Sequence, residues 1–227
     1  MAHRATQRDV RVKRSRGFTL IEMAVVIGIL GVIAALAVPS IVGNTDNERL
    51  KTSTRGVSRA FSLARSEAVR TNNVYLVFVG TDALGADLPD INGDPAVVAV
   101  VNDGALGSAN QNCRIDAGET VYRLAPSLNV TGGVLAGVTQ MAEDVGIGAR
   151  ATGSTFTEPD ADAASWVLFR PEGTAHSFDS ACVVGGIGSG AGGIYLNNGT
   201  RQFGVALRPL GTTRVRIWNA GAAQWGT

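Results

Sequence analysis

The chain has few of the side chains that perform chemistry. Its 227 residues include two cysteines, two histidines and an aromatic content of only 6%. The HExxH, GxSxG and CxxC patterns are absent, and outside the basic N-terminal segment His176 is the one histidine. A single histidine cannot supply the clustered ligands of a zinc site. Its neighbours Ser177 and Asp179 do not predict a catalytic triad, because triad members converge from separate elements. We therefore expect no catalytic residue, no metal site, no cofactor and no small-molecule substrate.

Acidic side chains are also scarce near the start of the chain. Residues 1–17 carry six basic side chains against one acid, a net charge of +5, and the apolar run that follows has Glu22 as its only ionisable side chain before Asp46. The 23 uncharged residues from 23 to 45 would form about 35 Å of helix, enough to cross a bilayer. A secretory signal has a shorter apolar core. The pattern predicts a leader at 1–17 and a spanning helix at 18–40, with Pro39 as a kink and the N-terminus cytoplasmic.

Glu22 is out of place in such a helix. An ionised carboxylate within lipid costs roughly 2.5–3.5 kcal/mol at mid-helix and somewhat less near an end. Such a group normally has a partner or a function. A cut between Gly17 and Phe18 would create an ammonium group at Phe18 within reach of a carboxylate of the same or a neighbouring chain. Pairing on assembly would then offset the cost of the charge.

The N-terminal pattern resembles a known signal. Residues 17–22 read GFTLIE, after a short basic leader and before an apolar helix, which is similar to the class III signal of type IV pilins and type II secretion pseudopilins. The resemblance implies that a prepilin peptidase cuts after Gly17 and methylates the Phe18 amine. It also implies that Glu22 pairs with the amine of an adjacent subunit as the helices stack into a filament.

The pattern changes twice after Pro39. Residues 41–72 show an apolar stripe at three- and four-residue steps, typical of a helix that packs on a domain and runs to about Thr71. Beyond residue 73, short alternating segments predict strands; they are 74–79, 96–101, 120–124, 165–169, 193–197, 203–208 and 214–218. Glycine-rich stretches between them, such as 131–162, predict loops or short excursions. The expected fold is α+β, a long N-terminal helix packed on an antiparallel β-sheet head domain at 73–227.

A second resemblance covers more of the chain. Residues 64–68 read ARSEA and 74–76 read VYL, similar to the helix-to-strand segment of the GspH/FimT family of minor pseudopilins and pilins. The later segments FRPEG at 169–173, GIYL at 193–196, VAL at 205–207 and RVRI at 214–217 resemble the family's strands. A long middle region and Thr213, in place of the family's glycine, depart from it.

Cys113 and Cys182 are the only cysteines. In a reducing cytosol they would be incidental thiols. The expected topology places both in the periplasm, where disulfides persist, so we predict a structural disulfide between them.

Two loops resemble ligand-binding motifs without meeting their requirements. Residues 87–94 alternate oxygen ligands, but Pro95 and Val101 stand at positions that an EF-hand loop gives to ligands. Residues 188–193 satisfy GxGxxG, yet they lead into a predicted strand and not into a helix N-terminus that could hold a pyrophosphate. We interpret both as surface turns.

The C-terminal end is basic. Arg214 and Arg216 alternate in a predicted strand and so share a face, with Trp218 next along it. Arginines and aromatics can hold phosphates and stack on bases. FimT-like members of competence pili resemble this, with a C-terminal Gly-Arg-x-Arg that binds DNA, although a strand with a basic solvent face remains the simpler interpretation.

The favoured hypothesis is a non-enzymatic minor pseudopilin of a type II secretion system. It would be a single-pass inner-membrane protein with a periplasmic head that enters or caps a pseudopilus. Its partners would be prepilin peptidase, other pseudopilins or pilins, and membrane lipid. The alternative is a minor type IV pilin that acts in pilus assembly or in DNA binding for uptake.

Overall fold

The computed structural model describes residues 18–80, 98–116, 119, 121–124, 127–147, 150, 153–157, 163–164, 166–179 and 181–226. Side chains at 35–44 lie outside this description. The chain divides into two compact units, Met1–Gly43 and Asn44–Thr227. Only the second contains strands among the described residues.

One helix, α1, spans Leu20–Thr71 and contributes to both units. It ends before Asn72, whose positive φ of 57° is the left-handed conformation that commonly terminates helices. The predicted apolar stripe of its second part is confirmed, since its members are fully buried; they are Leu50, Thr54, Val57, Phe61, Ala64 and Ala68. The predicted end at about Thr71 is confirmed as well.

Two antiparallel sheets of five strands each pack in the second unit. The first has the order β3 (Val121–Leu124), β2 (Val98–Ala105), β1 (Asn73–Val79), β7 (Trp166–Phe169), β8 (Ala175–Ser177). The second has the order β12 (Gln224–Gly226), β11 (Thr213–Asn219), β10 (Gln202–Leu207), β9 (Gly192–Asn197), β4 (Thr131–Gly132). A separate pair joins β5 (Phe156–Thr157) to β6 (Ala163–Ala164).

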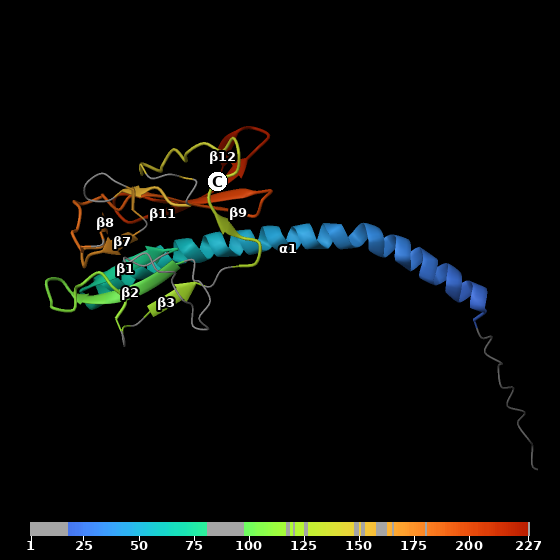
Figure 1. Cartoon of the computed structure of the whole chain (residues 1–227), viewed down its shortest axis with the longest axis horizontal. Coiled ribbons are helices and arrows are strands. Elements are labelled where there is room, and N and C mark those ends of the chain that lie inside the picture. Colours follow the sequence, from blue (N-terminus) through green and yellow to red (C-terminus); the bar gives the residue numbers. More distant parts are fainter. Residues whose placement is uncertain are drawn as a thin grey trace, which may run out of the picture. The chain divides into compact units, whose positions relative to one another are not determined.

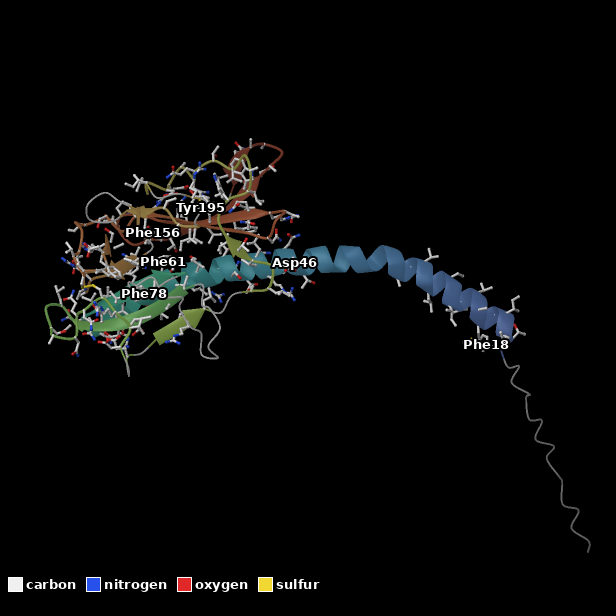
Figure 2. All side chains as sticks on the ribbon, viewed as in Figure 1. Phe18, Asp46, Phe61, Phe78, Phe156 and Tyr195 are labelled. Atoms are coloured by element: carbon white, nitrogen blue, oxygen red, sulfur yellow. A yellow bond between two sulfur atoms is a disulfide. The ribbon has the colours of Figure 1, made fainter. Side chains whose placement is uncertain are left out.

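The α+β class and the packing of a long helix on antiparallel sheet are confirmed, and the strands form two sheets. The main core explains why. It contains side chains from α1, from β1, β2 and β7 of the first sheet, and from β9 and β10 of the second. Figure 1 shows β1, β2 and β3 on one side of the end of α1, and β9 and β11 on the other. Phe61 of α1 lies 5.9 Å from Phe156 and 6.4 Å from Phe169, ring centre to ring centre (Figure 2).

A second core lies on the opposite face of the first sheet. Successive residues of a strand point to opposite faces, so Tyr75 and Val77 of β1 join the main core while Leu76 and Phe78 join the second. This explains why β1 is apolar on both faces. The second core is covered by the segment after β2 and the segment after β8, which contribute Cys113, Ile115, Phe178, Cys182 and Val184.

The predicted disulfide joins those two covering segments. Cys113 and Cys182 are bonded, with their Cα atoms 5.3 Å apart. Cys113 is 1% exposed and packs within the second core. The disulfide therefore holds the cover of the second core in place, which sequence spacing alone did not indicate.

The described residues of the 131–162 region include short strands. It supplies β4 and β5, and Asp144 anchors its middle. Asp144 accepts hydrogen bonds from the Tyr195 hydroxyl (2.5 Å) and the Thr155 hydroxyl (2.6 Å). Burial of the Tyr195 hydroxyl and its hydrogen bond to Asp144 raise the pKa of Tyr195. Because the partners lie on β9 and beside β5, this buried network ties the region to the second sheet (Figure 2 labels Tyr195).

Candidate assembly site at the helix N-terminus

The first turn of α1 is capped by a reciprocal pair. The backbone N–H and the hydroxyl of Thr19 both donate to Oε2 of Glu22, at 2.8 and 3.0 Å. The Glu22 N–H donates in return to the Thr19 hydroxyl at 3.3 Å. This is a capping box, in which an N-cap threonine and the glutamate three residues later satisfy each other's backbone donors. Glu22 therefore has a partner within its own chain, placed at the end of the helix next to Phe18.

The side chains around this cap are apolar and uncovered. Phe18 is 82% exposed and Leu20 is 89% exposed (Figure 2 labels Phe18). The same holds further along the helix, on every face, for Ile21, Met23, Val25, Val26, Ile27, Ile29, Leu30, Val32 and Ile33. A helix that is apolar all round is normally buried in lipid or in protein. This part of α1 therefore presents a surface that requires a cover.

Several predicted features lie outside the described residues. Gly17 and the rest of the leader are among them, as is the side chain of Pro39, so the cleavage and the kink stay predictions. Within the part of the chain that the structure describes, no helix is long and apolar enough to cross a membrane.

Comparison with known proteins identifies this N-terminus. Residues 12–38 match the family described as the prokaryotic N-terminal methylation motif. The N-terminus therefore carries a methylation motif of this type. The chain is 57% identical over 35 residues to type II secretion system core protein G of Klebsiella pneumoniae, and 59% identical over 34 residues to that of Dickeya chrysanthemi. These matches cover 15% of this chain and 25% and 22% of the two relatives, so the chain spans about a quarter of the length of the relatives it matches.

A structural comparison gives one further likeness. The crystal structure of the type IV minor pilin FimU from Pseudomonas aeruginosa overlays with a TM-score of 0.40 and 12% identity, over 78% of this chain and 93% of that chain. Such an overlay is too loose to establish a shared fold. The similarity of this chain to known proteins therefore rests on the N-terminal motif and the sequence matches.

The basic strand is only partly available to a ligand. Arg214 and Arg216 lie on β11 as predicted, and Arg214 is exposed. Arg216 forms an ion pair with Glu143, and the Arg208 guanidinium lies 3.9 Å from the same carboxylate. The pairing with Arg216 lowers the pKa of Glu143, so this carboxylate stays ionised and compensates the arginine. Trp218 packs 5.4 Å from Trp225, ring centre to ring centre.

His176 is a buried strand residue. It lies in β8 and is 1% exposed. Its Nε2 lies 2.9 Å from the Thr174 hydroxyl and its Nδ1 lies 2.9 Å from the Gly185 carbonyl oxygen. The prediction missed β8 because it is only three residues long and polar at two of them. Residues 87–94, the oxygen-rich loop, lie outside the described residues.

Sequence reasoning missed two of these features, and only the first could have been found from the sequence. The spacing of Thr19 and Glu22 is the T-x-x-E pattern of a capping box, which a search for helix starts would find. By contrast, the partnership between Arg216 and Glu143 joins residues 73 positions apart. No local pattern could have revealed it.

Proposed function

We propose that the chain is a minor pseudopilin of a type II secretion system, of the GspH/FimT type. Prepilin peptidase cuts after Gly17 and methylates the Phe18 amine. The mature subunit then joins or caps a periplasmic pseudopilus and has no enzymatic activity. The single observation that carries this proposal is a carboxylate, Glu22, held at the start of a helix whose apolar side chains are exposed on every face. The methylation motif and the matches to core protein G support it.

The proposed topology follows from charge and hydropathy. Residues 18–40 lie in the inner membrane, with the basic leader in the cytoplasm and the head domain in the periplasm. Leader removal takes away six basic residues and one acid, which leaves the mature chain with 14 basic and 18 acidic residues, a net charge of −4. The loss of the leader therefore also removes the charge that keeps the N-terminus at the cytoplasmic surface.

Assembly replaces lipid with protein around the apolar helix. Stacked helices of neighbouring subunits cover side chains such as Phe18, Leu20 and Ile21. The carboxylate of Glu22, which its own chain satisfies only through Thr19, meets the methylated amine of an adjacent subunit. In an apolar surrounding this pair fixes the axial register of the subunits, because a shifted register leaves both charges without a partner.

The processing step gives the first test. Co-expression of the full chain with an active prepilin peptidase is expected to yield a product that begins at Phe18 and carries one methyl group, read by intact mass and N-terminal peptide sequencing. Gly17→Val, which adds a branched side chain at the cleaved bond, should leave the chain uncut. Gly28→Val is the matched control, since nothing lies within 4 Å of a side chain added there. An uncut wild-type chain beside a processed reference prepilin would contradict the proposal.

The alternative function is a minor type IV pilin that binds DNA. Its specific support is Arg214, an exposed cation on β11. It predicts that the full chain retards DNA in a gel, and that Arg214→Ala weakens binding and lowers the salt dependence by about one phosphate contact. Arg216→Ala should have the smaller effect, because Glu143 already neutralises that guanidinium. Absence of any retardation at low salt would rule this alternative out.

A further inference from the structure

A buried carboxylate lies beside the disulfide. Asp103 in β2 is fully buried, and its Oδ1 accepts the N–H groups of Asn112 and Cys113, each at 3.1 Å. A carboxylate oxygen of Asp103 and the Sγ atoms of Cys113 and Cys182 all lie within 4.8 Å of one another. At this range a proton can pass between oxygen and sulfur after a small side-chain rotation or through one water molecule. The sheet thus places an acid–base group next to a sulfur–sulfur bond.

The surroundings of Asp103 bring its pKa closer to neutral pH. Burial raises the pKa of Asp103 to about 6, although the two N–H donors lower it. The nearby carboxylates of Glu119 and Asp116 raise it further. On the segment that carries Cys182, the charged group is Asp179, whose Oδ1 accepts the N–H groups of Ala181 and Val183. A group with such a pKa can both donate and accept a proton near pH 7.

Both cysteines hold an unfavourable backbone conformation. The φ angle is 58° at Cys113 and 63° at Cys182. Ordinary L residues rarely adopt the left-handed region, and they persist in it where the surrounding structure forces them. Here the N–H of Cys113 donates to Asp103 and the N–H of Cys182 donates to the Asp179 carbonyl oxygen. The turns around both cysteines therefore fix where the two sulfur atoms meet.

The two sulfurs differ in accessibility. Cys113 is 1% exposed and belongs to the second core, whereas Cys182 is partly exposed. An external thiolate therefore reaches the residue Cys182 first, and Cys113 becomes the leaving group. We propose that the Cys113–Cys182 disulfide exchanges with external thiols in the folded protein, with Cys182 as the attacked residue and Asp103 as the proton donor and acceptor for the Cys113 sulfur.

The exchange balances with glutathione as the co-reactant. A glutathione thiolate attacks Sγ of Cys182, the sulfur–sulfur bond breaks, and its electron pair leaves on Sγ of Cys113. That thiolate takes the proton of the Asp103 carboxylic acid. In the reverse direction the Asp103 carboxylate takes the proton of the Cys113 thiol, and the resulting thiolate attacks the mixed disulfide at Cys182. A glutathione thiolate leaves, and the protein disulfide is closed again.

The rate of closure tests this directly. The purified full chain is reduced with dithiothreitol under native conditions, freed of reductant and mixed with oxidised glutathione. Acid quenching, alkylation and intact mass then follow the mixed disulfide and its closure from pH 5 to pH 9. For the wild type we expect the closure rate, plotted against pH, to show an inflection near pH 6 in addition to the inflection from the thiol. Asp103→Asn should remove that inflection and slow closure at pH 7 by about tenfold or more.

A matched control separates proton transfer from a structural role. Asn in place of Asp keeps Oδ1 as an acceptor at both positions, so Asp179→Asn should close within about twofold of the wild type. A wild-type closure rate whose pH dependence shows only the thiol inflection overturns the proposal. An Asp103→Asn chain that closes its disulfide as fast as the wild type overturns it as well. A reduced wild-type chain that loses its strand signal in circular dichroism would also overturn it, because the thiols would no longer be held beside Asp103.

Discussion

Replacement of both Cys113 and Cys182 by alanine is expected to lower the free energy of unfolding by about 4 kcal/mol. The cross-link closes a segment with a sequence separation of 69 residues, and the entropy that it removes from the unfolded chain grows with the length of that segment. It also joins the two segments that cover the second core. Urea unfolding of the full chain, followed by circular dichroism, measures the change.

Two comparisons make this result specific. The wild type in the presence of reductant should unfold at nearly the same urea concentration as the double variant, because both lack the same bond. Hydrogen exchange should lose protection first at Leu76 and Phe78, whose side chains face the second core, while Leu50 and Phe61 of the main core retain it. A loss below about 1 kcal/mol, or one spread evenly over both cores, would contradict the role that we assign to the disulfide.

The helix and several strands could be predicted because their signals are local. The period of 3.6 in the apolar stripe determined which side chains of α1 are buried, from Leu50 to Ala68, and the alternation in segments such as 203–208 located β10. The number of sheets could not be predicted in this way. It depends on the burial of Val74, Leu76 and Phe78 on the face of β1 opposite the helix. The sequence of a strand that is apolar on both faces does not indicate which segments cover each face.

The polar contacts of the head domain were hidden for a related reason. Asp103, Asp144 and Glu143 are acidic residues in stretches that look like surface loops in sequence, yet Asp103 and Asp144 are buried and Glu143 is paired. Each is satisfied by groups from another segment, such as Tyr195 for Asp144 and Arg216 for Glu143. Burial of a carboxylate depends on partners that only the folded chain brings together. The cap formed by Thr19 and Glu22 is the opposite case, since both partners lie within one turn.

Glu22→Ala is expected to reduce incorporation of the subunit into filaments by more than about tenfold. Removal of one partner of a buried ion pair leaves the other uncompensated, at a cost of roughly 3–5 kcal/mol. Here the group left without a partner would be the methylated amine of Phe18 in a neighbouring subunit. Filaments are cross-linked in cells and recovered by pull-down on another filament subunit, and the variant subunit is quantified by immunoblot, with its amount in the membrane and its N-terminal processing as references. Both references should remain at wild-type levels, since the change lies beyond the cleaved bond.

The capping box allows the charge and the cap to be separated. Glu22→Gln keeps an oxygen that can accept the Thr19 hydrogen bonds but removes the charge, and it should fail to assemble as Glu22→Ala does. Thr19→Val removes the hydroxyl from both of its hydrogen bonds but keeps the carboxylate; the loss of the cap costs about 1 kcal/mol of helix stability, so this variant should assemble at near wild-type levels. If Thr19→Val failed and Glu22→Gln assembled, the role of Glu22 would be that of a helix cap, and the ion pair with a neighbouring amine would be excluded.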